Sequence, residues 1–123
     1  MTDLSLYASI TADVAGDAEQ FEEMGEEELA TMSFALKAAA LASGALLRQR
    51  CGDDYERSRL HIARATALPP RVLQRRVREA ERIVTLGGMP SLPQHAAHIA
   101  FLMMNVAVVE ACLERKQSGT GLQ

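Results

Sequence analysis

The sequence has no tryptophan, few aromatic side chains and only two cysteines. Aromatic residues make up 4% of the 123 residues, and Cys51 and Cys112 are too few for a disulfide framework. Two lone cysteines are typical of a chain in a reducing compartment, where thiols stay free. With 48% hydrophobic and 24% charged residues, the composition indicates one soluble domain. A domain of this size folds around a single core without a structural metal.

A long uninterrupted apolar run and a basic amino terminus are also lacking. The longest mostly apolar stretch, 96–109, is interrupted by His98 and Asn105, and it is shorter than the roughly 20 residues that span a bilayer. No lysine or arginine precedes Lys37, so the start lacks the positive charge of a signal peptide. We therefore expect a cytoplasmic protein without membrane contact.

Charge is distributed unevenly along the chain. The first 30 residues hold nine acidic side chains and no basic one, whereas residues 48–82 hold ten arginines and five acids. The formal net charge of -3 therefore describes a molecule with an acidic beginning and a basic middle. Such an asymmetry bears on partners rather than on the fold.

The hydrophobic pattern has a helical period throughout, and no segment alternates as a strand does. We predict an all-α, single-domain bundle of about five helices over residues 1–116, followed by a flexible tail over 117–123. The expected helices run over 4–14, 26–49, 71–86 and 92–116, and a further helix, capped by Asp53 or Asp54, runs as far as Leu68. The last helix is apolar almost all round, which predicts a central position.

Local residues mark the ends of these helices. Gly52 favours the left-handed conformation that ends a helix, and Pro69 and Pro70 break the chain before the fourth helix. Ser91 and Gln94 have the spacing of a capping box. Within the second predicted helix, the small residues Ala38, Ala42 and Ala45 predict that another helix approaches closely.

An arginine stripe follows one face of the helix at 71–86. At about 100° per residue, Arg71, Arg75, Arg78 and Arg82 lie within about 60° of one another. Such a stripe can meet phosphates, solvent, or the acidic segment 17–28 of the same or a neighbouring chain. Arg76 lies toward the apolar side, which indicates either an interface residue or a side chain that reaches solvent from the edge.

The segment Leu60–Val84 resembles a helix-turn-helix module. Ala63, Ala67 and Leu73 have its small and apolar spacing, and arginines follow on the second helix. The resemblance implies a small DNA-binding regulator. The usual turn glycine is replaced by Ala67, and two prolines lie in the turn.

Two further patterns bear on catalysis and metal binding. The run from Cys51 resembles the motif C-x-x-C-x-x-x-H of helical carboxymuconolactone decarboxylases and alkylhydroperoxidases, but Asp54 and Ser58 replace its second cysteine and histidine, so no dithiol forms. His95 and His98 are three residues apart, and no acid lies near them in sequence to complete a metal site. We expect no catalytic residue, no metal and no cofactor.

The last helix carries both a mixed seam and flexible apolar side chains. His98 and Asn105 share a stripe in which a lone Asn either sets the register of a self-association contact or is a satisfied core residue. Phe101, Met103 and Met104 are either core residues or a surface that grips a partner.

In size, helix content and its apolar helix at 99–109, the chain resembles the small helical antiactivators of LuxR-type quorum-sensing transcription regulators. The resemblance implies a bacterial homodimer that inhibits a regulator by occupying its dimerisation or ligand-binding surface. We expect anchors at Arg76, Phe101, Met103 and Met104. Arg71, Arg75 and Arg78 would steer an acidic partner.

Overall fold

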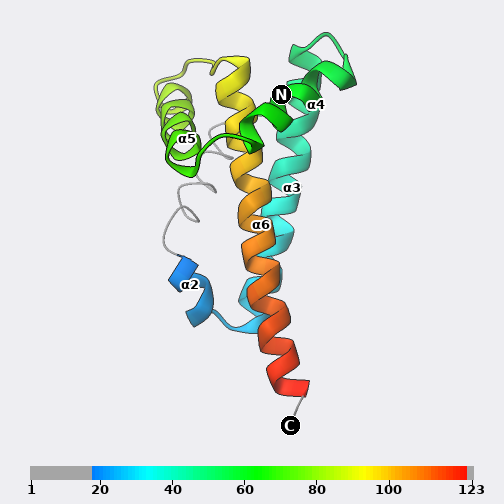
Figure 1. The fold of residues 1–123 in the computed structure, drawn as a ribbon, viewed down its shortest axis with the longest axis vertical. Helices are drawn as coiled ribbons and strands as arrows, with labels where there is room; N and C mark the ends of the chain where they lie inside the picture. Colours follow the sequence, from blue (N-terminus) through cyan, green and yellow to red (C-terminus); the bar gives the residue numbers. More distant parts are fainter. Residues whose placement is uncertain (1–17, 122–123) are drawn as a thin grey trace.

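A computed structural model describes residues 18–121, and the side chains of residues 21–118, and every regular element in this part is a helix (Figure 1). The helices are α2 (Ala18–Glu23), α3 (Glu26–Arg50), α4 (Tyr55–Thr66), α5 (Pro70–Thr85) and α6 (Leu92–Gly121). The all-α prediction is confirmed for this part of the chain. The helix predicted at 4–14 lies outside the described residues, and the short α2 was not predicted.

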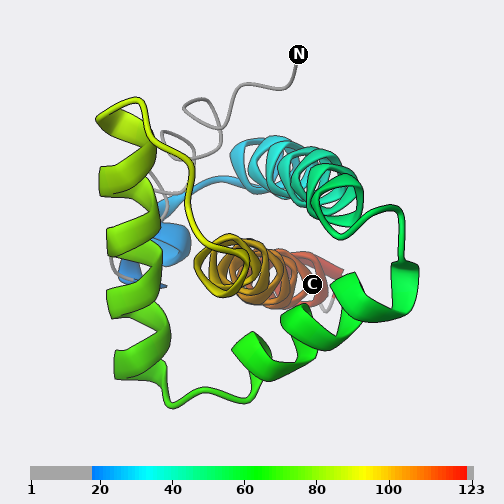
Figure 2. The ribbon, with the colours of Figure 1, turned by 90° about the horizontal axis from the view of Figure 1, so that it is seen from above.

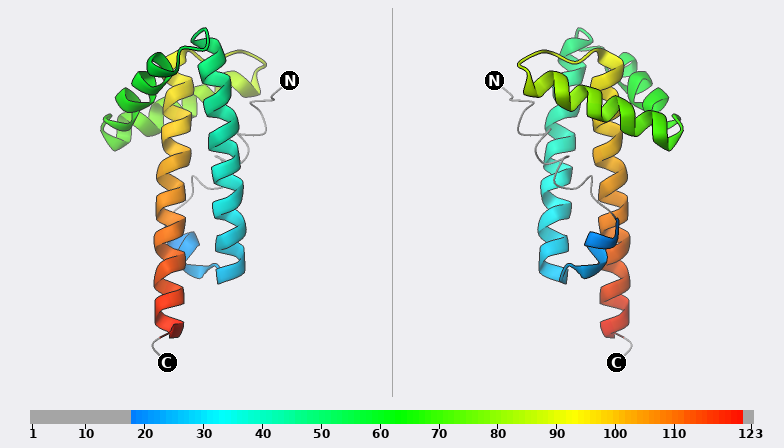
Figure 3. Two further views of the ribbon diagram at one scale, coloured as in Figure 1. Left: turned by 90° about the vertical axis from the view of Figure 1, so that its right-hand side faces the viewer. Right: turned by 90° about the vertical axis from the view of Figure 1, so that its left-hand side faces the viewer.

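The two longest helices, α3 and α6, form an antiparallel pair that runs the length of the molecule (Figure 3). The helices α4 and α5 gather around one end of this pair, where α3 ends and α6 begins. Seen from above, α4 and α5 lie on different sides of α6 (Figure 2). The helix α6 contacts each of the other four helices, so the prediction of a central last helix is confirmed.

The caps and turns follow the residues that predicted them. Asp54 caps α4, because its side chain accepts a hydrogen bond from the backbone N–H of Arg57. Gly52 ends the turn after α3 with φ of 69°, and Asp53 follows it with φ of 62°. At the start of α6, the N–H of Gln94 donates to Ser91 Oγ, and the N–H of Ser91 donates to Gln94 Oε1. The predicted capping box is confirmed.

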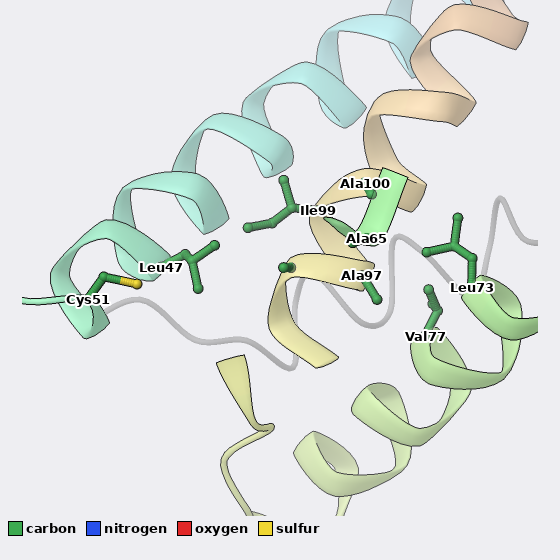
Figure 4. Close-up of a cluster of buried hydrophobic side chains, with 9 residues drawn as sticks. Leu47, Cys51, Ala65, Leu73, Val77, Ala97, Ile99 and Ala100 are labelled. Atoms are coloured by element: carbon green, nitrogen blue, oxygen red, sulfur yellow. The ribbon is translucent and has the colours of Figure 1, made fainter. Parts of the chain in front are cut away.

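The core consists of two clusters, one on each half of the α3–α6 pair. The upper cluster joins α3, α4, α5 and α6 through Leu47, Ala65, Leu73, Val77 and Ile99 (Figure 4). The lower cluster joins α2, α3 and α6 through Phe21, Leu29, Leu36, Leu102 and Val109. Fully burying one such side chain contributes roughly 1.5–3 kcal/mol. These clusters fix α4 and α5 to one end of the pair and α2 to the other.

The helix α6 differs from its predicted length. It continues to Gly121, past the predicted end at Lys116, so the segment predicted as a flexible tail is helical as far as Gly121. Each glycine in a helix costs about 1 kcal/mol relative to alanine. Extending an existing helix is nevertheless easier than starting one, and no proline stops it.

Two helices are long and apolar enough to cross a membrane, by length and composition alone. They are Glu26–Arg50 and Leu92–Ser118. The expectation that no stretch reaches this length is therefore wrong for the helices as they form. The core helix of a soluble protein meets the same criterion, so this is weak evidence for a membrane span.

Candidate functional site

The described surface offers a ligand a groove bounded by α3, α4 and α6, with a volume of about 770 Å³. We call it the α3–α4–α6 groove. Its walls are mostly apolar and include Leu41, Tyr55, Ile62, Met103 and Val106. The groove exists because α3 and α4 both pack on α6 but contact each other over a small area near the turn that joins them. From Lys37 to Arg48 its α3 wall is about 16 Å long, at about 1.5 Å per residue.

The polar groups along the groove are already engaged or basic. The Ser58 hydroxyl donates to the backbone oxygen of Tyr55 at 2.8 Å, so it does not require a ligand. Lys37 pairs with Glu110 of α6. Arg59 pairs with Glu56 at 3.3 Å, and Arg48 forms no ion pair within residues 18–121. The groove is thus an apolar trough with basic side chains on its rim.

The ion pair between Lys37 and Glu110 is anchored to the core side of α3. The Ser33 hydroxyl donates to Glu110 Oε1 at 3.3 Å. The hydrogen bond from Lys37 lowers the pKa of Glu110, which keeps the carboxylate charged. Glu110 therefore stays paired with Lys37 at the groove and does not offset the charge of Arg48.

The structure separates the apolar residues that the sequence grouped as partner anchors. Met103 is 53% exposed and lines the groove. Met104 is 42% exposed but does not line it. Phe101 is half-buried against the upper core cluster, so it lies at the edge of the core, and its role as a partner anchor stays a prediction.

The arginines of α5 do not border the groove, because α5 lies across α6 from α4 (Figure 2). Arg71, Arg75 and Arg78 are exposed, whereas Arg76 is half-buried. None of these four forms an ion pair with a described residue. The stripe is therefore a basic surface separate from the groove.

Glu22, a member of the acidic segment, pairs with α6. Glu22 of α2 accepts from Arg115 at 2.5 Å, and its backbone oxygen accepts from Lys116 at 2.8 Å. These contacts fix α2 to the lower part of α6. The predicted alternative of an ion pair within the chain between the acidic segment and the α5 arginines is therefore wrong for Glu22.

The predicted self-association residues face the interior of the chain. His98 is 6% exposed. The Asn105 side chain is half-buried and donates to the backbone oxygen of Phe101 at 2.9 Å. For His98 the prediction of a contact between two copies is corrected, because its own chain encloses it. For Asn105 the alternative, a satisfied core residue, fits these contacts.

His95 joins α6 to α3 at the buried end of the pair. An arginine only donates, so the 2.9 Å contact with Arg50 assigns Nδ1 of His95 as the acceptor. Nε2–H then donates toward Ser43, whose Oγ and O lie at 2.9 and 3.1 Å. Burial, followed by the charge of Arg50, lowers the pKa of His95 to about 4. The ring is therefore neutral, and both nitrogens are occupied by protein groups.

No group of three or more candidate ligands for a metal ion occurs among the residues that the structure describes. His95 has no lone pair free for a metal, because its acceptor nitrogen faces Arg50. The cysteines, Cys51 and Cys112, are buried and form no disulfide bond. His95 is thus a structural feature of the core.

Several groove residues were not predicted from the sequence. Leu41, Arg48, Tyr55, Arg59 and Ile62 come from two helices that the sequence does not place together. The sequence of α3 did contain an indication of the groove, because Phe34 and Leu41 lie on the helix face opposite the one whose apolar spacing predicts burial. Both are about three-quarters exposed, at 75% and 76%.

In comparisons with known proteins, no family model, no curated protein and no solved structure matches the chain. The resemblance to antiactivators thus remains a prediction, and the groove itself carries the functional argument.

Proposed function

We propose that the chain is a non-enzymatic regulatory protein that binds an acidic amphipathic helix of a partner protein in the α3–α4–α6 groove. The observation that carries the proposal is the groove itself, an apolar trough with Lys37, Arg48 and Arg59 on its rim. An amphipathic helix laid into a groove is a common mode of peptide recognition. Such a helix buries an apolar face on Met103 and Ile62 while its flanking carboxylates meet the basic rim.

The dimensions support a helix as the occupant. The α3 wall of about 16 Å matches about three helical turns at about 5.4 Å per turn. The volume of about 770 Å³ accepts the apolar side chains of one helix face. A fourth helix packed on α3, α4 and α6 completes a bundle, which is a stable arrangement of helices.

The regulatory part of the proposal follows from this mode of binding. Covering a helix that a transcription regulator uses for dimerisation or ligand binding keeps the regulator inactive. A LuxR-type regulator is the partner class that the sequence resemblance suggests. The proposal places the chain in the cytoplasm, which fits its two free, buried cysteines.

The test is a nuclease-treated capture experiment with three versions of the full chain. The wild-type chain, Met103→Glu and Met104→Glu are tagged and exposed to the native lysate. A protein retained by the wild type and by Met104→Glu, but lost with Met103→Glu, supports the groove. Identification of that protein as a DNA-binding regulator supports the regulatory role. Equal retention by all three versions contradicts the proposal.

A second candidate function is a small DNA-binding regulator. It is favoured by one observation, the exposed arginines Arg71, Arg75 and Arg78 on α5 after the tight turn from α4. Positively charged side chains on a helix bind phosphates through release of counterions, so such binding weakens steeply with salt. DNA binding that requires Arg75 and Arg78 but not Met103 identifies this alternative.

A further inference from the structure

The outer face of α3, turned away from α6, has a heptad pattern that no described helix covers. Its seven residues are Glu27, Thr31, Phe34, Ala38, Leu41, Ala45 and Arg48, and all of them are exposed. Successive members are four and three residues apart, which is the spacing of a coiled-coil seam. The opposite face of α3 carries the buried residues Leu29, Ser33, Leu36, Ser43 and Leu47. The outer face is therefore a second contact surface of this helix.

The charges at the two ends of this face are opposite. Glu26, Glu27 and Glu28 occupy the first turn of α3, and Arg48 lies in its last turn. Between these ends the seam holds only uncharged side chains. A surface that is acidic at one end and basic at the other is complementary to its own copy turned end over end.

We infer that two copies of the chain pair antiparallel through this outer face of α3. In antiparallel packing, each large side chain meets a small one of the other copy. Phe34 packs against Ala45 of the second copy, and Leu41 packs against Ala38 of the second copy. In this register Arg48 lies opposite Thr31 of the second copy, one helical turn from Glu27, a distance that the long arginine side chain spans. Each contact occurs twice, as a two-fold axis requires.

The residues argue against a parallel pair and against an unrelated partner. A parallel pair places Glu27 beside Glu27 and Arg48 beside Arg48, so like charges meet at both ends. A partner of uniformly acidic or basic charge complements only one end of the face. A second copy satisfies both ends and also accounts for the small residues at Ala38 and Ala45, which no helix within residues 18–121 covers.

This inference does not depend on the proposed function. Phe34, a large apolar member of the seam, does not line the α3–α4–α6 groove. Leu41, Ala45 and Arg48 belong to both surfaces, so self-association shields one edge of the groove. A partner helix then binds the monomer in preference to the dimer of two copies.

The test measures the mass of the full chain in solution by sedimentation equilibrium. The wild type is expected at twice 13.4 kDa, and Phe34→Glu at the monomer mass with an unchanged helical circular dichroism spectrum. Leu86→Glu is the matched control, because Leu86 is also 76% exposed but lies after α5. It is expected to remain a dimer. A monomeric wild type, or a dimeric Phe34→Glu, overturns the inference.

Charge reversal tests the antiparallel register. Glu27→Arg and Arg48→Glu, each alone, place like charges together and are expected to weaken the dimer about fivefold or more. The double variant Glu27→Arg with Arg48→Glu restores opposite charges and is expected to regain wild-type affinity. Failure of the double variant to recover overturns the register. Binding of an acidic peptide to monomeric Phe34→Glu separates this test from the proposed function, because that variant keeps the groove rim.

Discussion

Met103 and Met104 are adjacent in α6, yet only Met103 lines the groove between α3, α4 and α6. Both side chains are exposed, at 53% and 42%. Consecutive residues of a helix point about 100° apart, so the two methionines sample different surfaces with the same chemistry. The pair therefore provides a test of the groove with a built-in control.

We expect Met103→Glu to abolish binding of an acidic amphipathic helix, because it adds a carboxylate to the apolar wall. The loss should be at least about tenfold in Kd, the size of removing one apolar anchor and adding charge repulsion. Met104→Glu should bind as the wild type does. Isothermal titration calorimetry with a synthetic acidic amphipathic peptide measures both. Equal losses for the two variants would show that the groove is not the binding surface.

The basic rim gives a second prediction with a matched control. The double variant Arg48→Glu with Arg59→Glu should weaken the same peptide about tenfold, because two rim charges then repel its carboxylates. Arg75→Glu with Arg78→Glu changes the net charge equally on α5, away from the groove, and should have little effect at moderate salt. A larger effect of the α5 pair would place the acidic partner on the arginine stripe.

The helices were predictable because their ends are local properties. Asp54, Gly52 and the Ser91–Gln94 box define boundaries through short-range hydrogen bonds and backbone conformation. The short α2 was not predictable in the same way, since its Phe21 becomes helical and buried only by packing in the lower cluster. Helices this short depend on tertiary contacts.

The groove was beyond prediction for a different reason. It depends on how α3 and α4 diverge over α6, which no local pattern encodes. For the same reason the sequence left two alternatives open for the stripe of His98 and Asn105, a self-association contact or a satisfied core position. Their stripe is mixed in character, and only the packing of α6 shows that His98 is enclosed.

The buried His95 predicts a loss of stability in mild acid. Its pKa is lowered to about 4 in the folded chain, first by burial and then by Arg50, whereas the ordinary value near 6.5 applies when the chain is unfolded. The contribution of neutral His95 to the free energy of unfolding is complete above about pH 6.5. It declines as the pH falls toward about 4, by up to about 3 kcal/mol. Urea unfolding between about pH 7 and about pH 5 measures this change.

The control is His95→Gln, which keeps a polar side chain but does not titrate. Its overall stability should be lower, since the bonds to Ser43 and Arg50 change. Its pH dependence should be flatter than that of the wild type over the same range. Parallel pH profiles for the two proteins would contradict the role of His95.

The lower cluster predicts a stability effect without a binding effect. Leu36 is fully buried between α3 and α6, so Leu36→Ala should reduce the free energy of unfolding by about 2–5 kcal/mol. Leu86→Ala, at an exposed position, should change it by less than about 0.5 kcal/mol. Chemical denaturation followed by circular dichroism measures both. A small effect at Leu36 would show that the α3–α6 contact is looser than the structure describes.

Salt separates the two candidate functions. Binding of duplex DNA through α5 should weaken at least about a hundredfold between about 50 and about 200 mM salt, because phosphate contacts release counterions. Binding in the apolar groove should weaken only a few-fold over the same range. Fluorescence anisotropy with labelled duplex and labelled acidic peptide measures the two slopes. Salt-resistant DNA binding fits neither account.

The most direct test of the central claim is an NMR titration of the isotope-labelled full chain with a synthetic amphipathic helix of about 12 residues, the length that fills the groove at about 1.5 Å per residue. The helix carries leucines on one face and glutamates beside them, and a matched peptide carries lysines in place of the glutamates. We predict that the acidic peptide shifts amide signals around Leu41, Ile62 and Met103, and that the basic peptide does so only weakly. Shifts confined to α5, or equal shifts from both peptides, would contradict the account.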